Sequence, residues 1–377
     1  MFRRTTLAVI AIAAAMSVAA CGKKSSDSKS ESDKTSAAKS TKHKAATQTA
    51  AQKNHRAARQ NPARPAARPV VMPRPKPGEA IPKGGSGKAY TLALHIKAGQ
   101  VFDLTFTSKQ KIHQTVMGKK QDMDQVMGMT YSMSVKNMQS NGTADMVIAY
   151  TAIQFHQKSV AMTIDYDSTK GQVPNNPMAK VFAALKGQTF KMTITKQGHV
   201  TKIKGMSAIV DRMLAALQLP EGPAKKAVEK RIRKQFSDEA VRSSMENMLD
   251  FYPEGPVKVG GSWTKTKLYN LGMALALINR YTLDKVHHGV AFLTVTSTVT
   301  SVPGSSMPFG AKGSLTYKLS GIQTGTMELP LATGLATKAV LKQNMSGTVT
   351  MKQTPTSPGI SWPISLSSDI ILAAAKK

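Results

Sequence analysis

Histidines and closely spaced acids are the residues of this chain that could support metal binding or catalysis. Of the eight histidines, only His287 and His288 are adjacent. Neighbouring side chains of a strand point to opposite faces, so this pair does not converge on one ion. No spaced carboxylate or thiol accompanies it, as a zinc site would require. The sequence predicts neither a metal site nor a cofactor.

Two pairs of aspartates, Asp122 with Asp124 and Asp165 with Asp167, each lie two residues apart. Such a pair on one strand face could hold calcium or act as acid and base. Carboxylates are also common in turns without any such role. The sequence contains neither a Gly-x-Ser-x-Gly elbow nor a phosphate-binding glycine loop. We therefore expect no catalytic residues and a protein that is not an enzyme.

A basic segment combines positive charge with an apolar stripe at helical spacing, formed by Val228, Ile232 and Phe236. Its cations are Lys225, Lys226, Lys230, Arg231, Arg233 and Lys234. A basic amphipathic helix can lie on an anionic membrane. The alternative is a helix that docks through its stripe and leaves the cations in solvent. Both interpretations stay open at this stage.

Methionine is frequent, with 22 residues, whereas aromatic residues make up only 5%. The neighbouring predicted strands carry Met129, Met133, Met146 and Met162. Because methionine is flexible and polarizable, it can line a surface that accepts an apolar ligand. It can equally fill an ordinary core in place of aromatic residues. These four residues are the candidate lining of an apolar site.

An export signal precedes the strands and helices that position these residues. Arg3 and Arg4 precede an apolar run that ends at Cys21, too short for the roughly twenty residues that span a bilayer. Its end, Val18-Ala19-Ala20-Cys21, resembles the lipobox of bacterial lipoproteins. The resemblance implies a signal peptide over 1–20 and a lipidated Cys21 that attaches the protein to a membrane. A cleaved signal without lipidation is the alternative.

Position in the envelope follows from the same motif. Gly22 stands where an aspartate marks inner-membrane retention in the enterobacterial pattern. This favours the outer membrane over the inner one, with the rest of the chain in the periplasm. The net charge is +31, which in an exported protein favours contact with anionic lipid headgroups or cell-wall polymer. Nucleic acid is not an expected partner in that compartment.

Composition divides the mature chain into two parts. Residues 21–88 form a basic linker, rich in Lys, Ala and Ser and then in Pro and Arg, which cannot build a core and is predicted to be disordered. Its proline-rich part favours an extended polyproline II conformation. Residues 89–377 are long enough to bury a sizeable core. The single cysteine excludes an intramolecular disulfide.

Residues 89–377, the body of the protein, show two periodicities of apolar residues. Apolar residues alternate with polar ones in many short runs, which predicts antiparallel strands with one polar face. These runs cover 90–96, 102–106, 129–135, 145–153, 160–166, 190–195, 263–268, 280–286, 291–299, 315–319, 336–345, 348–351 and 364–371. Between about 174 and 252 the period changes to that of amphipathic helices. We expect an α+β fold, mainly antiparallel, with a curved sheet or half-open barrel on which the helical segment packs.

Five short motifs resemble landmarks of a family of bacterial envelope lipoproteins of unknown function. They are Lys97-Ala98-Gly99-Gln100, Tyr166-Asp167-Ser168, Gly198-His199-Val200, Phe251-Tyr252-Pro253 and Val257-Lys258-Val259-Gly260-Gly261-Ser262-Trp263. The resemblance covers nearly all of the body and implies no activity. The order of strands, helices and strands is also similar to half-open barrels that carry lipids and lipoproteins across bacterial envelopes. Fold alone does not give function.

Three functions compete at this stage. The leading hypothesis is non-catalytic binding of an apolar or lipid-like ligand between helices and sheet. The second is a structural or scaffolding module that binds cell-wall polymer or a protein partner, and the third is an envelope hydrolase. A methionine-lined cavity would favour the first, a filled core the second, and a converging acid and base the third.

Overall fold

The computed structural model describes residues 79–160, 162–171, 176–270, 273–309, 313–351 and 359–377. All of these residues belong to one compact unit. The predicted signal peptide, Cys21 and the linker up to residue 78 lie outside the described residues.

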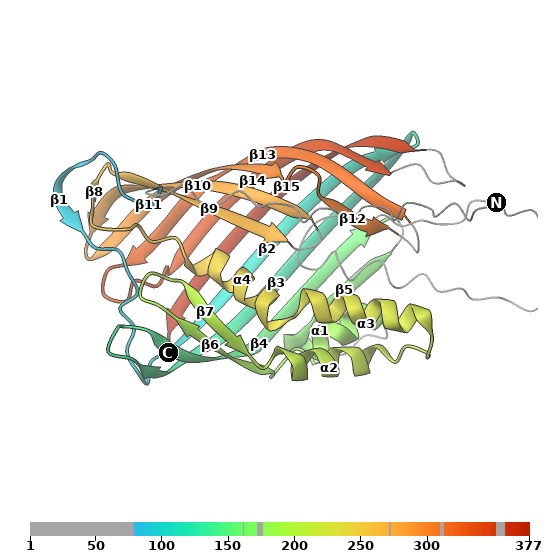
Figure 1. Ribbon diagram of the computed structural model, residues 1–377, viewed down its shortest axis with the longest axis horizontal. Helices are drawn as coiled ribbons and strands as arrows, with labels where there is room; N and C mark the ends of the chain where they lie inside the picture. Colours follow the sequence, from blue (N-terminus) through green and yellow to red (C-terminus); the bar gives the residue numbers. More distant parts are fainter. Residues whose placement is uncertain (1–78, 161, 172–175, 271–272, 310–312, 352–358) are drawn as a thin grey trace, which may run out of the picture. The chain divides into compact units, whose positions relative to one another are not determined.

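Within the described residues, a 13-stranded antiparallel sheet is the main element (Figure 1). Its main path runs β7-β6-β4-β3-β2-β15-β14-β13-β11-β10-β9, while β5 pairs with β4 and β12 with β13. The first strands are β2 (Val101–Val116), β3 (Lys119–Met138), β4 (Ala144–Ser159), β5 (Thr163–Asp167), β6 (Thr189–Ile194) and β7 (Val200–Lys204). The later strands are β9 (Ser262–Asn270), β10 (Ala274–His287), β11 (Val290–Ser301), β12 (Ser306–Phe309), β13 (Gly313–Pro330), β14 (Lys338–Met351) and β15 (Ile360–Lys376).

Period-two alternation gives each long strand a buried and a solvated face. On β2, Phe102, Leu104 and Ile112 are buried, whereas Lys109 and Lys111 are exposed. Because successive side chains point to opposite faces, the apolar phase turns inward and the lysines outward. The sheet therefore has one inner face and one outer face.

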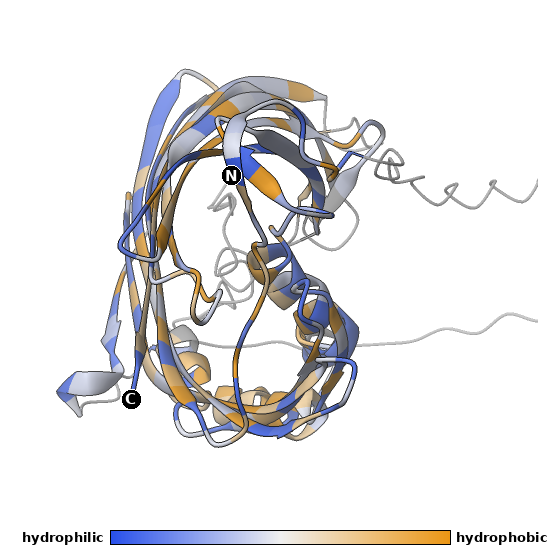
Figure 2. Ribbon diagram, turned by 90° about the vertical axis from the view of Figure 1, so that its left-hand side faces the viewer, coloured by the Kyte–Doolittle hydropathy of each residue, from blue (hydrophilic) through white to orange (hydrophobic). Residues whose placement is uncertain are grey.

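Glycines let β13 approach β14 closely. A Cβ at Gly321 would lie 2.1 Å from the carbonyl oxygen of Asn344, and one at Gly325 would lie 2.0 Å from that of Val340. No side chain fits at these distances, and glycine inside a strand commonly marks such a close approach or a tight bend. The sheet curves around its inner face (Figure 2).

Helices of the middle segment lie on the concave side of the sheet (Figures 1 and 2). They are α1 (Pro177–Ala183), α2 (Met206–Leu217), α3 (Pro223–Gln235) and α4 (Asp238–Leu249), and a short 3-10 helix covers Ser168–Lys170. Ser237 caps α4 by accepting a 3.1 Å hydrogen bond from the Ala240 backbone N–H, and Asp238 and Glu239 suit the positive end of the helix dipole. Helix α4 contacts both β7 and β9, the two ends of the strand path.

This architecture confirms the predicted α+β fold with a curved antiparallel sheet and a packed helical segment. That segment also contains β7, which the sequence did not predict. Among the described helices, none has both the length and the apolar composition that a membrane-crossing helix requires.

The start of the body differs from the sequence prediction. Residues 91–97 are not a strand; Leu94 instead donates its backbone N–H to the carbonyl of Lys196, at 2.8 Å. The apolar side chains of this segment still pack into the core, which explains their alternation. Strand β1 (Ser86–Tyr90) pairs with β8 (Val257–Val259), and the carbonyl of Ala80 accepts a hydrogen bond from Glu254. Ordered contacts thus begin within the segment that the sequence assigned to the linker.

Candidate functional site

A row of polar side chains crosses the inner face of the sheet, strand by strand. Each member lies directly opposite the next in the pairing register. In spatial order, the polar row is Gln157, Gln125, Gln110, Ser368, Gln343, Gln323, Ser297, Asn279 and Lys265. Neighbouring strands lie about 4.8 Å apart, so the row extends over roughly 40 Å along the sheet.

The polar row separates two apolar clusters of the inner face. On β10, Tyr281 and Leu283 belong to the first cluster and Leu275 and Leu277 to the second, with Asn279 between them. Residues of all four helices contribute to the first cluster, whereas every buried member of the second, apart from Met273, lies on a strand. The interior is therefore apolar at both ends and polar in the middle.

Several amide atoms of the polar row are buried without a hydrogen-bond partner among the described residues. Gln125 is 1% exposed, Gln157 2% and Asn279 5%. Within the described part of the chain, no hydrogen bond reaches either amide atom of Gln125, Oε1 of Gln110 or Gln157, or Oδ1 of Asn279. A buried polar group without a hydrogen bond is costly, and most have a protein or water partner. The unpaired atoms of Gln110, Gln125 and Gln157 lie on three adjacent strands, whereas Asn279 lies towards the other end of the row.

Two amides of the row donate hydrogen bonds to nearby serine hydroxyls. Gln323 donates from Nε2 to the Ser297 hydroxyl at 3.3 Å, and Gln110 donates from Nε2 to Ser108 at 3.2 Å. The unpaired atoms thus lie on β2, β3, β4 and β10.

The predicted methionine lining is packed into the first apolar cluster. Met129, Met133 and Met146 are buried in it, and Met162 is partly buried against it. The cavity beside Met133 and Met146 has a volume of about 10 Å³, which is the space of about one water molecule. These side chains fill the core between helices and sheet and leave no room for a lipid chain at that point.

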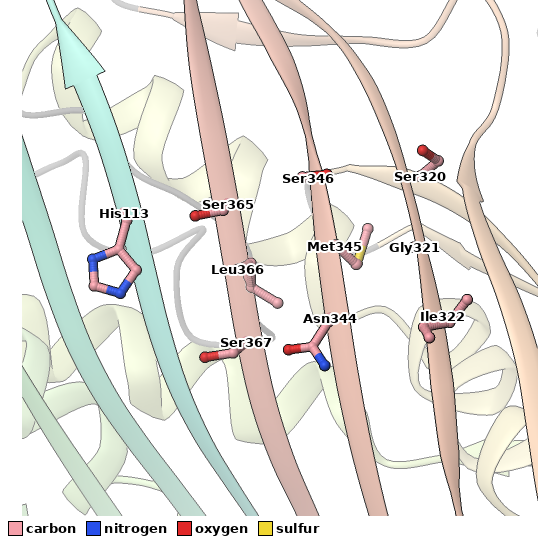
Figure 3. Close-up of a pocket in the computed structure, with 10 residues that line it drawn as sticks. All are labelled: His113, Ser320, Gly321, Ile322, Asn344, Met345, Ser346, Ser365, Leu366 and Ser367. Carbon is pink, nitrogen blue, oxygen red and sulfur yellow. The ribbon is translucent and has the colours of Figure 1, made fainter.

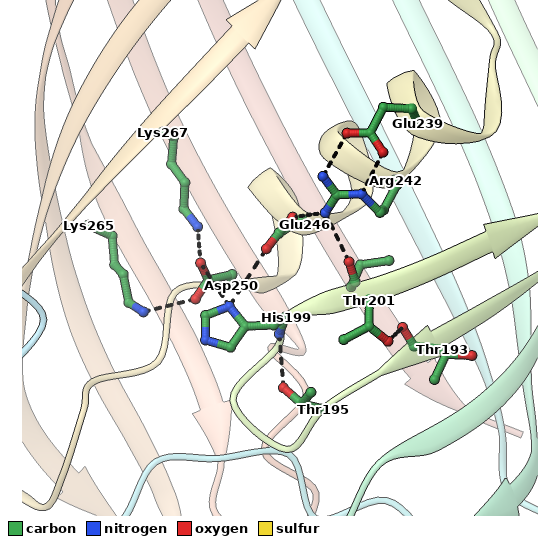
Figure 4. Close-up of polar contacts among 11 residues, drawn as sticks. Thr193, Thr195, His199, Thr201, Glu239, Arg242, Glu246, Asp250, Lys265 and Lys267 are labelled. Carbon is green, nitrogen blue, oxygen red and sulfur yellow. Dashed lines mark hydrogen bonds and ion pairs between the residues drawn. The ribbon is translucent and has the colours of Figure 1, made fainter. Parts of the chain in front are cut away.

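At the β9 end of the polar row, Lys265 joins a buried ion-pair cluster (Figure 4). Asp250, at the end of α4, accepts from Lys265 Nζ at 2.9 Å and from Lys267 Nζ at 2.7 Å. Burial alone would raise the pKa of Asp250, but the two lysines outweigh burial and hold its pKa below the ordinary value. Burial lowers the pKa of Lys267, partly offset by the charge of Asp250.

His199 connects this cluster to α4 from the β6–β7 turn. Its Nδ1 lies 3.7 Å from Glu246 and 3.6 Å from Asp250. The neighbouring Glu246 carboxylate raises the pKa of His199 above its ordinary value, and His199 lowers the pKa of Glu246. Arg242 binds Glu246 at 2.5 Å and also donates to the Val200 carbonyl at 3.1 Å. The cluster therefore ties α4 to both ends of the strand path.

His199, Glu246 and Asp250 offer ligand atoms within 4.8 Å of one another, a spacing that could hold a metal ion. Each carboxylate, however, already pairs with cations of the protein, Glu246 with Arg242 and Asp250 with the two lysines. A divalent cation would have to displace these positive charges, so the arrangement favours an ion-pair network. The same pairing leaves neither carboxylate as a free general base.

Of this network, the sequence pointed only to His199, within the Gly198-His199-Val200 motif, and it pointed to none of the polar row. A signal did exist: Lys265 and Lys267 occupy the same phase of β9 as Trp263 and Tyr269, and Gln125 shares the phase of Met127. Polar residues in an apolar phase mark positions that must find partners inside the fold.

The other predicted site residues lie apart from the inner face. Asp122 pairs with His113 at 3.0 Å, and Asp165 lies 3.6 Å from His156, all of them largely exposed. On α3, Lys225 pairs with Glu221, and Arg233 with Asp211 at 2.8 Å. The cations without an ion pair to another described residue are Lys226, Lys230, Arg231 and Lys234. Ile232 and Phe236 are buried in the first apolar cluster, so the stripe docks the helix.

An open concavity of about 490 Å³ lies on the sheet across β2, β15, β14 and β13 (Figure 3). Ser365 and Ser367 of its lining alternate with buried Leu366, so their side chains belong to the outer face. The lining is rich in hydroxyl and amide groups: His113, Ser320, Gly321, Ile322, Asn344, Met345, Ser346, Ser365, Leu366 and Ser367. Ile322 is a large apolar side chain exposed there.

A family model matches residues 141–336, more than half of the chain and most of the sheet. The chain belongs to DUF6263, a family of unknown function. The matched span includes the polar-row residues Gln157, Lys265, Asn279, Ser297 and Gln323. No catalytic family matches, and no protein of curated function is similar to this DUF6263 chain.

Solved structures show only distant likeness to this DUF6263 chain. A structure concerning lipid–protein interactions in lipovitellin aligns with 74% of this chain and 25% of its own, at 5% identity and a TM-score of 0.40. OccK7 (OpdD) of Pseudomonas aeruginosa aligns at 9% identity, with 74% of this chain, 100% of its own and a TM-score of 0.21. This chain thus spans a quarter of the lipovitellin chain, and neither TM-score supports an argument about function.

Proposed function

We propose that this protein is a non-catalytic binding protein of the cell envelope that holds an amphipathic ligand on the inner face of its sheet. The observation that carries the proposal is the polar row, with unpaired buried amides between two apolar clusters. An amphipathic molecule matches that pattern, because it presents apolar surface and polar groups side by side. The site differs from the expected one, since the space beside Met133 and Met146 is filled.

A binding role agrees with the chemistry of the described titratable groups. Glu246 and Asp250 are engaged by cations, so this cluster serves to hold α4 in place. We expect no turnover of a bound ligand.

Native mass spectrometry tests the proposal directly. The full chain carrying Cys21→Ser, which cannot take a lipid at that position, is purified from the periplasm without detergent. An extra mass that is lost on denaturation supports the binding function and gives the ligand class. A protein that carries no extra mass and takes up none from an added envelope lipid extract contradicts it.

A scaffolding role is the second candidate, favoured by the outer concavity in Figure 3. Its hydroxyl and amide groups suit a neutral polymer such as a cell-wall glycan. This role predicts that the protein sediments with purified peptidoglycan and that Ile322→Arg, which places a bulky charge in the concavity, abolishes sedimentation. The same variant leaves ligand binding on the inner face unchanged.

We further propose that Cys21, which lies outside the described residues, carries the lipid anchor and places the body on the periplasmic side of the outer membrane. The lipobox-like sequence supports this proposal. Metabolic labelling with a palmitate analogue is expected to mark the native chain and not Cys21→Ser. Separation of inner and outer membranes then gives the location.

A further inference from the structure

We propose that the polar row recognises the ligand through an uncharged, hydroxyl-rich head group, as found on a glycolipid. This inference rests on the proposed binding function and specifies the chemical class of the ligand. It follows from three properties of the row: which atoms lack partners, which charges surround them and where the apolar surface lies.

Most of the unpaired atoms of the row are acceptors, so their missing partners are hydrogen-bond donors. Four of them are carbonyl oxygens, on Gln110, Gln125, Gln157 and Asn279, and one is the Nε2 of Gln125. Each oxygen accepts hydrogen bonds and Nε2 donates them. A hydroxyl group both donates and accepts, so several hydroxyls can satisfy the four atoms of Gln110, Gln125 and Gln157, which lie on three adjacent strands. A phosphate diester offers acceptors alone and would leave the four oxygens unpaired.

Charge in the row excludes an ionic head group. Eight of its nine members are Gln, Asn or Ser, which carry no charge. The ninth, Lys265, shares the Asp250 carboxylate with Lys267 and lies at the β9 end of the row, far along the sheet from Gln110, Gln125 and Gln157. Burying a charged head group beside these amides, without an opposite charge, would be strongly unfavourable. The row therefore selects a neutral head group.

Apolar surface next to the row gives the ligand its second contact. The second cluster begins one inward position beyond the row on β10 and β11, at Leu277 and Val299. Its buried members come from strands and Met273, without a residue of the described helices. An alkyl chain attached to a hydroxyl-rich head group would lie along this cluster. The ligand class is thus a neutral glycolipid-like amphiphile.

The test compares two detergents that share a dodecyl chain. Dodecyl maltoside has a neutral head group rich in hydroxyls, whereas dodecylphosphocholine has a phosphate diester and no donor. Both are titrated below their critical micelle concentrations into the full chain carrying Cys21→Ser, and binding is followed by calorimetry. We expect dodecyl maltoside to bind at least about tenfold tighter, because one hydrogen bond is worth up to about 1.5 kcal/mol and 1.4 kcal/mol is tenfold in Kd.

Substitutions in the row test whether it causes the difference in affinity between the two detergents. Gln125→Met and Gln157→Met, which keep side-chain volume, should each weaken dodecyl maltoside binding about tenfold and leave dodecylphosphocholine unaffected. Gln154→Met, an exposed residue of the outer face of the same β4, is the control and should change neither. Because the two test variants lie on different strands, a folding defect in one leaves the other informative.

Other results would contradict either the head-group inference or the binding function. If both detergents bind equally, or if Gln125→Met and Gln157→Met bind dodecyl maltoside as the parent chain does, the head-group inference is wrong while the binding function stands. If neither detergent binds and native mass spectrometry shows no ligand, the binding function is wrong as well. Tighter binding of dodecylphosphocholine would assign the row to a phosphate-bearing ligand and contradict the inference.

Discussion

Gln125 of β3 lies directly opposite Gln157 of β4, and both side chains are buried on the inner face with amide atoms that have no partner in the described part of the chain. Glutamine is unfavourable at such core positions, because each side-chain amide loses its water on folding. In the ligand-free protein, burial of these amides therefore lowers the free energy of unfolding.

Gln125→Met should raise the free energy of unfolding of the ligand-free protein by about 1–3 kcal/mol, the desolvation cost of an unsatisfied amide. The matched control is Gln114→Met on the neighbouring β2. Gln114 is also buried, but its Oε1 accepts from Trp362 Nε1 at 3.2 Å. The control should therefore lose about 1–3 kcal/mol. Urea unfolding measures both, and equal destabilisation would mean that the Gln125 amide has a partner.

Asp250→Ala should destabilise the protein by about 3–5 kcal/mol, because it leaves Lys265 and Lys267 buried without a counter-ion. Asp211→Ala, which breaks the exposed pair with Arg233, should cost at most about 1 kcal/mol. Denaturant unfolding gives both values. Adding Lys265→Met and Lys267→Met to Asp250→Leu should recover most of the loss, and a failure to recover would point to a further role of the cluster.

His199→Asn should reduce stability mainly at acidic pH. The folded-state pKa of His199 is raised, chiefly by Glu246, above its ordinary value of 6.5. A raised pKa stabilises the fold fully below pH 6.5, and this contribution disappears as pH rises through the folded-state pKa. Unfolding curves of parent and variant should therefore differ most near about pH 5.5 and converge at about pH 9. A difference independent of pH would assign His199 a packing role alone.

Gly198→Ala should be strongly destabilising because this turn positions His199. Gly198 has φ +83°, and a Cβ there would lie 2.3 Å from the Leu249 carbonyl oxygen at the end of α4. The control is Gly171→Ala, at φ +74° with no atom within 4 Å of the added Cβ. The control measures the left-handed conformation alone, about 1–2 kcal/mol. Gly198→Ala should exceed it by thermal unfolding, and equal losses would show that the turn can move away from α4.

The unpaired cations of α3 should bind anionic membranes. Replacing Lys226, Lys230 and Lys234 by Gln should weaken binding to vesicles that contain phosphatidylglycerol by about 1 kcal/mol per lysine, and added salt should weaken the parent in the same way. Lys109→Gln with Lys111→Gln, exposed cations of β2, is the control. Cosedimentation that falls equally per lysine removed in both variants would indicate a response to net charge rather than a membrane-facing helix.

The sequence alone determined the fold class and most of its elements. Alternation identified the core faces of β3 and β10, and helical spacing identified α2 and α4, because both periodicities are local properties of the chain. Lengths were less accurate: 315–319 is part of the much longer β13, and the two predicted strands 336–345 and 348–351 correspond to the single strand β14. Gly321, Gly325 and Gly347 interrupt the alternation there, since close strand contact leaves no room for a side chain.

Only the tertiary structure decided which residues form the candidate site. Alternation places Gln125 and Gln157 on the inner face, but the pairing register, set by turns and ladder hydrogen bonds, places them opposite each other. Likewise, Asp250 ends a helix and Lys265 and Lys267 belong to a strand, and their meeting depends on how α4 packs beside β9. Local sequence fixes the direction of a side chain within its element, whereas the partners of buried polar groups are set by contacts between elements distant along the chain.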